Sequence, residues 1–328
     1  MKSSHANATR RPLSRQLGLS IIELLVALAI GSLLIAGAGF VYVQSRNSYA
    51  VNDSVARLQE TARFAISVIE PDVRMGGNWG LLNDSELVTG RAAQTAGAIL
   101  PGNANKCGTN FGVDLYTTIE GTDAGYTFGV ARQPGCNPGP AGGAARPNTD
   151  TLIVRRASGN PVAATAGRVQ VWSTRTSGGL FTDGVAPGAA VPPGGQVNDV
   201  VVNAYYISRD SDGRPNVPSL RRQSLVPGPD FQDQEIVSGV EDLQVQLGID
   251  PTGSAGIATR YVNPGVALPV GTQIVAVRLW VMTRADATEV GFQDSTNYQY
   301  ANRNVTPNDG FRRVLFSRTI QLRNRIRI

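Results

Sequence analysis

Histidine and lysine are scarce in this chain of 328 residues. The only histidine is His5, and the only lysines are Lys2 and Lys106. If the first 18 residues are removed by processing, no imidazole remains, which excludes a Ser/His or Cys/His nucleophile pair and any histidine-ligated metal. An enzyme would then need a Ser/Lys or carboxylate site. The sequence therefore predicts a non-enzymatic protein with no catalytic residues, no metal and no cofactor.

Charge is nearly balanced outside a short N-terminal stretch. The formal net charge is +5, but four basic residues precede Gly18 in a stretch without acidic residues, and the rest of the chain holds 26 basic and 25 acidic residues. A near-neutral body offers no electrostatic footprint for a polyanion, so nucleic-acid binding is not expected. Arginines at 318, 323, 325 and 327 make the C-terminal end basic, which indicates surface charge or a subunit contact.

Cysteine is also rare, and its spacing excludes two common sites. Cys107 and Cys136 lie in a segment rich in glycine, asparagine and proline, and they form neither a metal knuckle nor a C-x-x-C redox pair. In an oxidising compartment they would form one disulfide closing a loop of about 30 residues, which contributes roughly 3–4 kcal/mol in the chain-entropy model. In a reducing compartment they would remain spare thiols.

One long apolar run is present, at residues 19–43, and Glu23 is its only charge. As a helix it is long enough to cross about 30 Å of hydrocarbon. The basic residues before it predict that the first residues stay in the cytoplasm and the bulk of the chain is exported. Taken alone, the run also fits a signal anchor or a secretory signal peptide. A carboxylate inside such a span costs about 2.5–3.5 kcal/mol at the bilayer centre and little at the headgroup boundary.

The residues around Glu23 decide between these alternatives. Arg15-Gln16-Leu17-Gly18 followed by Leu19-Ser20-Ile21-Ile22-Glu23 resembles the class III signal of type IV pilins and pseudopilins. The resemblance implies that a membrane peptidase cuts between Gly18 and Leu19 and methylates Leu19, although phenylalanine is commoner than leucine at that position. It also implies that Glu23 meets the new N-terminal ammonium of a neighbouring subunit. In a medium of low dielectric constant such pairing would set the axial register of a filament.

Beyond the apolar run, the helix is predicted to continue to about residue 75. Apolar residues spaced by three and four form one face, and charged residues lie off it. The face is short and rich in alanine, so we expect it to pack against a sheet rather than form a free coiled coil. Pro71 and then Gly76-Gly77 are predicted to end the helix. The face consists of Val51, Val55, Leu58, Ala62, Ala65 and Ile69, with Arg57, Gln59, Glu60 and Arg63 off it.

The rest of the chain predicts an antiparallel sheet. Segments rich in β-branched and aromatic residues lie at 151–156, 168–173, 200–208, 217–225, 242–249, 273–283 and 314–323. The turn at 209–215 predicts a hairpin, and 173–198 and 250–271 are predicted connections. The fold class is therefore α+β and pilin-like, with a long N-terminal helix, first transmembrane and then amphipathic, packed on an antiparallel head with long loops.

Two acidic groups were candidates for chemistry. Asp210-Ser211-Asp212-Gly213 opens like a calcium loop, but no glutamate closes it, so a solvated hairpin turn is predicted. Glu235, Glu241 and Asp242 resemble a set of paired carboxylates. Strand alternation scatters their side chains between faces, so solvated surface is predicted for them as well.

Six dispersed segments, behind the prepilin signal, together resemble the PilW family of minor pilins. The resemblance implies a low-abundance subunit that joins other minor pilins, primes assembly of the type IV pilus and sits at or near its tip, with a role in adhesion and twitching motility. The segments are Glu70–Gly77, 204–207, 217–220, 237–244, 277–280 and 319–324.

The predicted organisation follows from these features. Residues 1–18 are a cleaved leader, 19–43 a transmembrane helix, 44–75 an amphipathic helix and 76–328 a periplasmic or extracellular head. The implied partners are other minor pilins, the major pilin, the prepilin peptidase, the inner-membrane assembly platform and a tip adhesin. The protein would lie in the inner membrane before assembly and at the pilus tip afterwards. The alternatives are a J-type pseudopilin of type II secretion, and a membrane-anchored binding protein or hydrolase.

Overall fold

The structure, a computed structural model, describes residues 18, 20–91, 107, 110–126, 136, 138–139, 145–186, 194–228 and 230–327. The side chains of residues 47 and 325–327 are not described. The chain divides into two compact units, Met1–Asp53 and Ser54–Ile328, and each is considered by itself. The leader before Gly18 lies outside the described residues.

Helix α1 (Ile21–Met75) contributes 55 residues to the two units. In the first unit its apolar side chains are exposed, Ile21 by 80% and Leu33 by 74%. Among the described residues it is the one helix long and apolar enough to cross a membrane, and its most apolar 18-residue window has a mean hydropathy of 2.5. The predicted apolar helix is therefore present, and a bilayer is the solvent that suits its surface.

The part of α1 in the second unit packs on sheets, as predicted. Leu58, Ala62, Ala65 and Ile69 are buried, while the charged residues off this face are exposed. The helix ends at Met75, directly before Gly76-Gly77, as predicted, and it continues through Pro71. A proline inside a helix costs about 3 kcal/mol. Burial of the next two residues, Asp72 and Val73, against the sheets holds the last turn in place.

Two main sheets form the head. The first has the order β1-β5-β4-β6-β3-β2, and β7 and β8 extend it from β6; the second has the order β10-β9-β11-β14. Their described strand pairs are antiparallel except β1–β5. The strands of the first sheet are β1 (Val88–Thr89), β2 (Ile119–Thr122), β3 (Thr151–Ala157), β4 (Ala166–Ser173), β5 (Gly178–Asp183), β6 (Gln196–Ser208), β7 (Ser219–Val226) and β8 (Asp230–Ser238).

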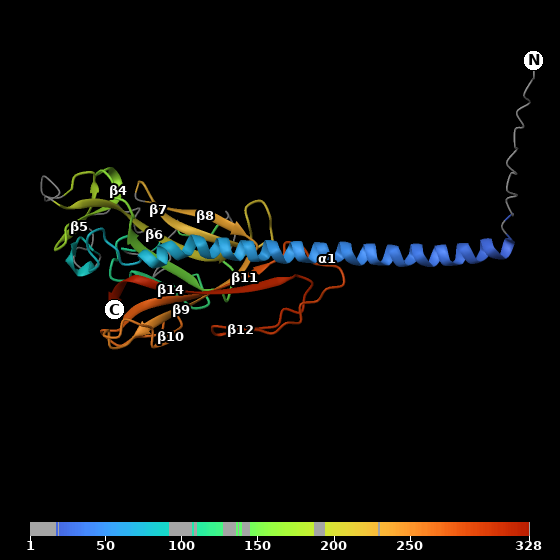
Figure 1. The fold of residues 1–328 in the computed structure, drawn as a ribbon. Coiled ribbons are helices and arrows are strands. Elements are labelled where there is room, and N and C mark those ends of the chain that lie inside the picture. The colour runs from blue at the N-terminus through green and yellow to red at the C-terminus, as the bar shows by residue number, and fades with distance from the viewer. Residues whose placement is uncertain are drawn as a thin grey trace, which may run out of the picture. The chain divides into compact units, whose positions relative to one another are not determined.

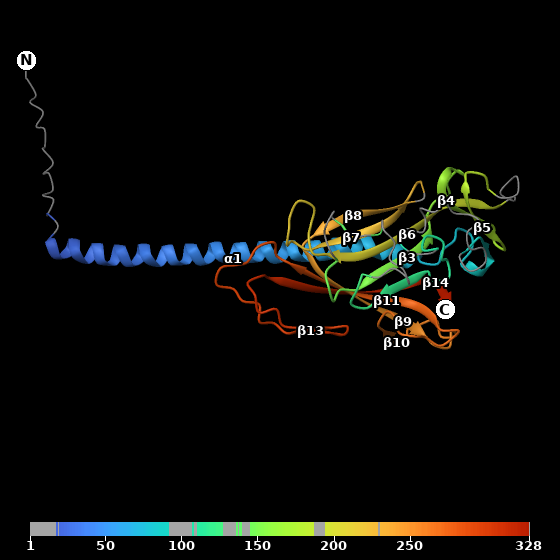
Figure 2. The ribbon, with the colours of Figure 1, turned by 180° about the vertical axis from the view of Figure 1, so that it is seen from behind.

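The second sheet contains the C-terminal strands. These are β9 (Val240–Asp250), β10 (Arg260–Val262), β11 (Gln273–Arg284) and β14 (Arg313–Arg327), and a separate ribbon pairs β12 (Tyr298–Tyr300) with β13 (Arg303–Val305). A short 3-10 helix, Ser85–Leu87, precedes β1. In Figures 1 and 2, β7 and β8 lie to one side of the second half of α1 and β9 lies to the other.

Two apolar clusters fill the head. The larger one joins α1 to both sheets, with Ile69 and Val73 from the helix, Tyr205 from the first sheet, and Leu243 and Val277 from the second. The smaller one packs Trp79, Phe111 and Val202 around the two cysteines. The predicted packing of the helix against a sheet is thus confirmed, and two sheets take part rather than one.

All seven predicted strands and the β6–β7 hairpin are present, but several strands were missed. The predicted connections at 173–198 and 250–271 contain β5 and β10, and β8 and the short strands β1, β2, β12 and β13 were not predicted. Strand β8 reads Asp-Phe-Gln-Asp-Gln-Glu-Ile-Val-Ser, which lacks an apolar face in its first half. Its acidic side chains instead accept hydrogen bonds from Arg221 on β7. The apolar pattern of β8 does not reveal this pairing.

Asp72 connects α1 to the first sheet. Its carboxylate is 5% exposed and accepts four hydrogen bonds. Arg156 on β3 donates two to Oδ1 at 3.0 and 2.7 Å, and on β6 the Asn203 amide and Tyr205 hydroxyl each donate to Oδ2 at 2.6 Å. Burial, together with the negative charge of Asp72, raises the pKa of Tyr205, so this hydroxyl stays a donor at neutral pH. The buried carboxylate is therefore fully compensated.

Asp72→Ala should destabilise the head by roughly 3 kcal/mol, because it leaves the Arg156 guanidinium buried and without its carboxylate. In thermal unfolding of the full chain in detergent, followed by tryptophan fluorescence, Tm should fall by about 6 °C. Glu60→Ala is the matched control, since Glu60 is exposed on the same helix. Equal Tm values for the two variants would contradict this role for Asp72.

Candidate functional site

The N-terminus of α1 begins with a capping box. The Glu23 backbone N–H donates to Ser20 Oγ at 3.2 Å, and the Ser20 backbone N–H reaches Glu23 Oε2 at 3.5 Å. Such reciprocal bonds satisfy two of the free N–H groups at a helix start. Both residues are exposed, as is Gly18, and Leu19 lies outside the described residues. The predicted cleavage and methylation sites therefore remain predictions.

The capping box offers a second account of Glu23. A carboxylate in the first turn also interacts favourably with the helix dipole, so local structure alone favours an acid here. Ser20-Ile21-Ile22-Glu23 before an apolar run is the sequence signature of such a cap. Exposure leaves the carboxylate accessible to a partner, so capping and pairing with an amine are separable roles.

The predicted disulfide between Cys107 and Cys136 is present, with 4.9 Å between the Cα atoms. Both cysteines are buried in the smaller core cluster. The Tyr126 hydroxyl donates to the Cys136 carbonyl oxygen at 2.8 Å, and the ring of Tyr126 packs edge-on against Tyr206 of β6. The bridge therefore joins the segment before β2 to the loop between β2 and β3, and Tyr126 packs that loop against the first sheet.

The predicted solvated turn at 210–213 is a hairpin turn, but its acids are engaged. Arg221 on β7 is buried and donates to Asp212 Oδ1 at 2.9 Å, to Asp233 Oδ2 at 2.7 Å and to Glu235 Oε2 at 3.0 Å. Burial acts to lower the pKa of Arg221, but the bonds to Asp233 and Asp212 outweigh it and raise that pKa. Glu235 is therefore half-buried in an ionic cluster around Arg221 and not part of a fully solvated surface, whereas Asp212 on the turn is exposed as predicted. No group of acids suited to a metal occurs among the described residues.

Glu241 and Asp242 were also predicted to be solvated, and both are buried, by 94% and 95% of their surface. The Glu241 carboxylate on β9 accepts hydrogen bonds from Arg313 Nε at 2.5 Å and from Arg146 Nη2 at 2.7 Å. The Asp242 carboxylate accepts a hydrogen bond from the Tyr300 hydroxyl at 2.5 Å. Alternation along β9 does send the two side chains to different partners: arginines bind Glu241, whereas Tyr300 and Gln244 donate to Asp242. Sequence spacing could not reveal the arginines or Tyr300, because they come from distant segments.

Arg313 at the start of β14 completes this second ionic cluster. Its Nη1 and Nη2 donate to the two oxygens of Asp309 at 2.7 and 2.8 Å, and Nη1 lies 3.5 Å from Asp294 Oδ2. Burial acts to lower the pKa of Arg313, but the bonds to Asp309 and Glu241 outweigh it and raise that pKa. The bond from Arg313 lowers the pKa of Asp309, against a smaller opposing effect of burial.

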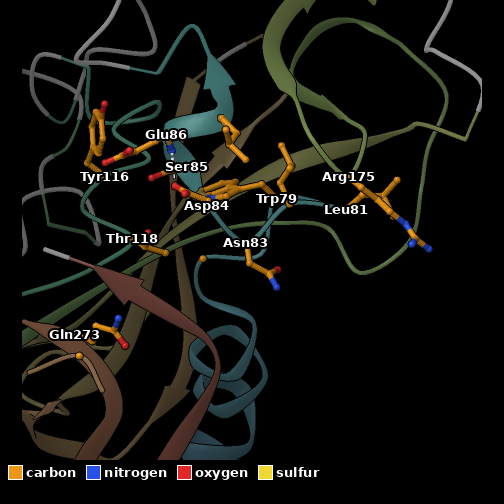
Figure 3. A pocket seen from close by; sticks show the side chains of 14 residues that line it. Trp79, Leu81, Asn83, Asp84, Ser85, Glu86, Tyr116, Thr118, Arg175 and Gln273 are labelled. Atoms are coloured by element: carbon orange, nitrogen blue, oxygen red, sulfur yellow. Dashed lines mark hydrogen bonds between the residues drawn. The ribbon is translucent and has the colours of Figure 1, made fainter. Parts of the chain in front are cut away.

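A pocket of about 480 Å³ lies just beyond the end of α1. Figure 3 shows Asp84, Ser85 and Glu86 on one side of it, Arg175 on another and Gln273 below. The Glu86 backbone N–H donates to Asp84 Oδ1 at 2.9 Å, which caps the short 3-10 helix. The polar groups therefore serve the local turn. Among the described lining residues there is no histidine, cysteine or lysine to act as a base or nucleophile.

Two protein-family models match this chain. Residues 13–39 match the prokaryotic N-terminal methylation motif, and residues 204–324 match the type IV pilus-assembly protein W, PilW. The C-terminal part of the head is therefore similar to PilW, and the N-terminus is similar to that of prepilins. Both features are those of a type IV pilus minor pilin, a structural component of the pilus, and the apolar helix accords with membrane anchoring. Searches of curated proteins and of solved structures found no match.

The PilW match runs from the last residues of β6 into β14. It includes Arg221 and Arg313, the arginines at the centres of the two ionic clusters. The six segments that carried the resemblance in the sequence contribute side chains to one place, the larger apolar cluster. Val73, Ile207, Leu220, Leu243, Val277 and Ile320 each come from a different segment. What the PilW-like segments share is therefore the packing of the two sheets around α1.

The Asp309–Arg313 pair predicts a pH dependence. A carboxyl group whose pKa is lowered in the folded state stabilises the fold above its unfolded pKa of 3.8, and this contribution disappears as pH falls through the folded pKa. Asp309→Asn should therefore lower Tm at pH 6, and its difference from the wild type should vanish near pH 2–3.

Asp286→Asn is the matched control for this measurement. Asp286 pairs with Arg214 at 2.6 Å, but both side chains are about half exposed, so its removal should change Tm little at any pH. A pH-independent effect of Asp309→Asn would refute the role assigned to its charge.

Proposed function

We propose that this protein is a minor pilin that assembles with other minor pilins to prime the type IV pilus, and that it sits at or near the pilus tip. The leader is cut after Gly18, residues 19–43 anchor the chain in the inner membrane, and the head lies in the periplasm until assembly. The observation that carries this proposal is the prepilin start of α1 on the same chain as the PilW match at 204–324.

The chemistry of Glu23 supports assembly within a membrane. Its carboxylate is exposed in the first turn of an apolar helix, so in hydrocarbon it needs a cationic partner. Cleavage between Gly18 and Leu19 creates an amine at the same level of a neighbouring subunit. Pairing the two charges favours one axial offset between adjacent helices and penalises the others.

The nearest rival is a J-type pseudopilin of a type II secretion system, which would share the prepilin signal and the α+β head. Deletion of the gene in its host separates the two. We expect loss of surface pili and of twitching motility, with type II secretion intact, and restoration of both by the wild-type gene. A secretion defect with normal piliation would overturn the proposal in favour of the rival.

Two substitutions separate the charge of Glu23 from its capping role. Glutamine also closes a capping box, so Glu23→Gln keeps the helix start and removes the charge. Ser20→Ala removes the cap, at a cost of about 1 kcal/mol, and keeps the charge. We expect Glu23→Gln to abolish complementation of piliation and Ser20→Ala to retain most of it.

The N-terminal mass of each membrane-extracted variant is the control. Both should begin at residue 19 when the prepilin peptidase is present and at Met1 when it is absent. If Glu23→Gln is processed and still supports normal piliation, charge pairing is not the role of this residue. If the wild type itself begins at Met1 in the presence of the peptidase, the assignment as a prepilin fails.

A further inference from the structure

A pocket of about 560 Å³ opens beside the second ionic cluster. It lies where the β6–β7 turn, the start of β9, the end of β11, the β12–β13 ribbon and the start of β14 meet. Its lining includes three acids, Glu241, Asp242 and Asp309, and a larger number of arginines. The five arginines are Arg146, Arg209, Arg284, Arg303 and Arg313. The walls therefore carry at least two positive charges in excess.

Three of these arginines have hydrogen-bonding capacity to spare. Arg284 Nε and Arg303 Nε are buried, and neither has a hydrogen-bond partner among the described residues. Arg303 Nε approaches Asp242 Oδ2 only to 3.7 Å. Arg209 is exposed on the rim, and no hydrogen bond or ion pair joins its side chain to another described residue. Arg146 and Arg313, by contrast, are held by Glu241.

An anion compensates such a site better than water does. A buried donor left without a partner keeps its full desolvation penalty. Water can satisfy the two Nε–H groups in a polar space of this size, but it leaves the excess positive charge in place. A carboxylate satisfies both needs, because its two oxygens match the planar donor fork of a guanidinium group.

The acids in the same pocket determine which anions can bind there. Glu241, Asp242 and Asp309 would repel a dianion such as phosphate more than a monoanion. The partly exposed oxygens of Asp309 and the amide of Asn216 can accept hydroxyl protons from a ligand. We propose that this pocket binds a hydroxylated monocarboxylate of the sugar-acid class, with Arg303 and Arg209 on the carboxylate. This role is separate from pilus assembly and does not depend on it.

The test is a titration of the purified full chain in detergent with sodium glucuronate, followed by saturation-transfer NMR. Glucuronate should bind. Glucose, which lacks the carboxylate, should not, and phosphate should bind at least several-fold more weakly. Arg303→Gln should weaken glucuronate binding roughly tenfold, because it removes a charged donor of hydrogen bonds to the carboxylate. Arg209→Gln should weaken it less, because Arg209 lies on the exposed rim.

Arg214→Gln is the matched control. Arg214 lies on the same β6–β7 turn and is about half exposed, but it pairs with Asp286 and does not line the pocket. Its removal should leave binding unchanged. Absence of glucuronate binding, equal binding of phosphate, or equal weakening by all three variants would overturn the proposal. If Arg303→Gln fails to fold, Arg209→Gln still decides, because it removes an exposed side chain that has no partner among the described residues.

Discussion

The head depends on one buried carboxylate, Asp72 in the last turn of α1. It is the point where the helix is bonded to β3 and β6 through Arg156, Asn203 and Tyr205. A buried charge that is fully hydrogen-bonded contributes little net stability but disfavours every arrangement in which its partners are missing. Apolar packing alone would allow the helix to slide or rotate over the sheets, and the Asp72 bonds select one position.

The same principle recurs in the two arginine clusters. Arg221 ties the β6–β7 turn to β8, and Arg313 ties the start of β14 to β9 and to the loop before it. The acids around Arg221 come from the preceding turn and the next strand, whereas Glu241 is distant in sequence from Arg313. The weakly apolar strand β8 therefore has a defined position even though its own pattern predicts none.

The strands predicted from the sequence were those with a strong apolar pattern, such as β9 and β11. Both are central in the second sheet and buried on both faces, so their composition reflects their surroundings directly. The missed strands β5, β8 and β10 lie at sheet edges or next to them, or are short. Their pairing depends on a neighbour that is already formed, and composition carries little information about it.

The sequence by itself determined the apolar helix, its prepilin start with Glu23, the class of fold and the cysteine pair, because each follows from local spacing or from a count of residues. Only the tertiary structure decided that Glu241 and Asp242 are buried, and that several arginines surround a pocket with unsatisfied donors. Partners from five separate segments create that environment. Burial and charge balance depend on which distant side chains meet, and no local pattern in the chain encodes this.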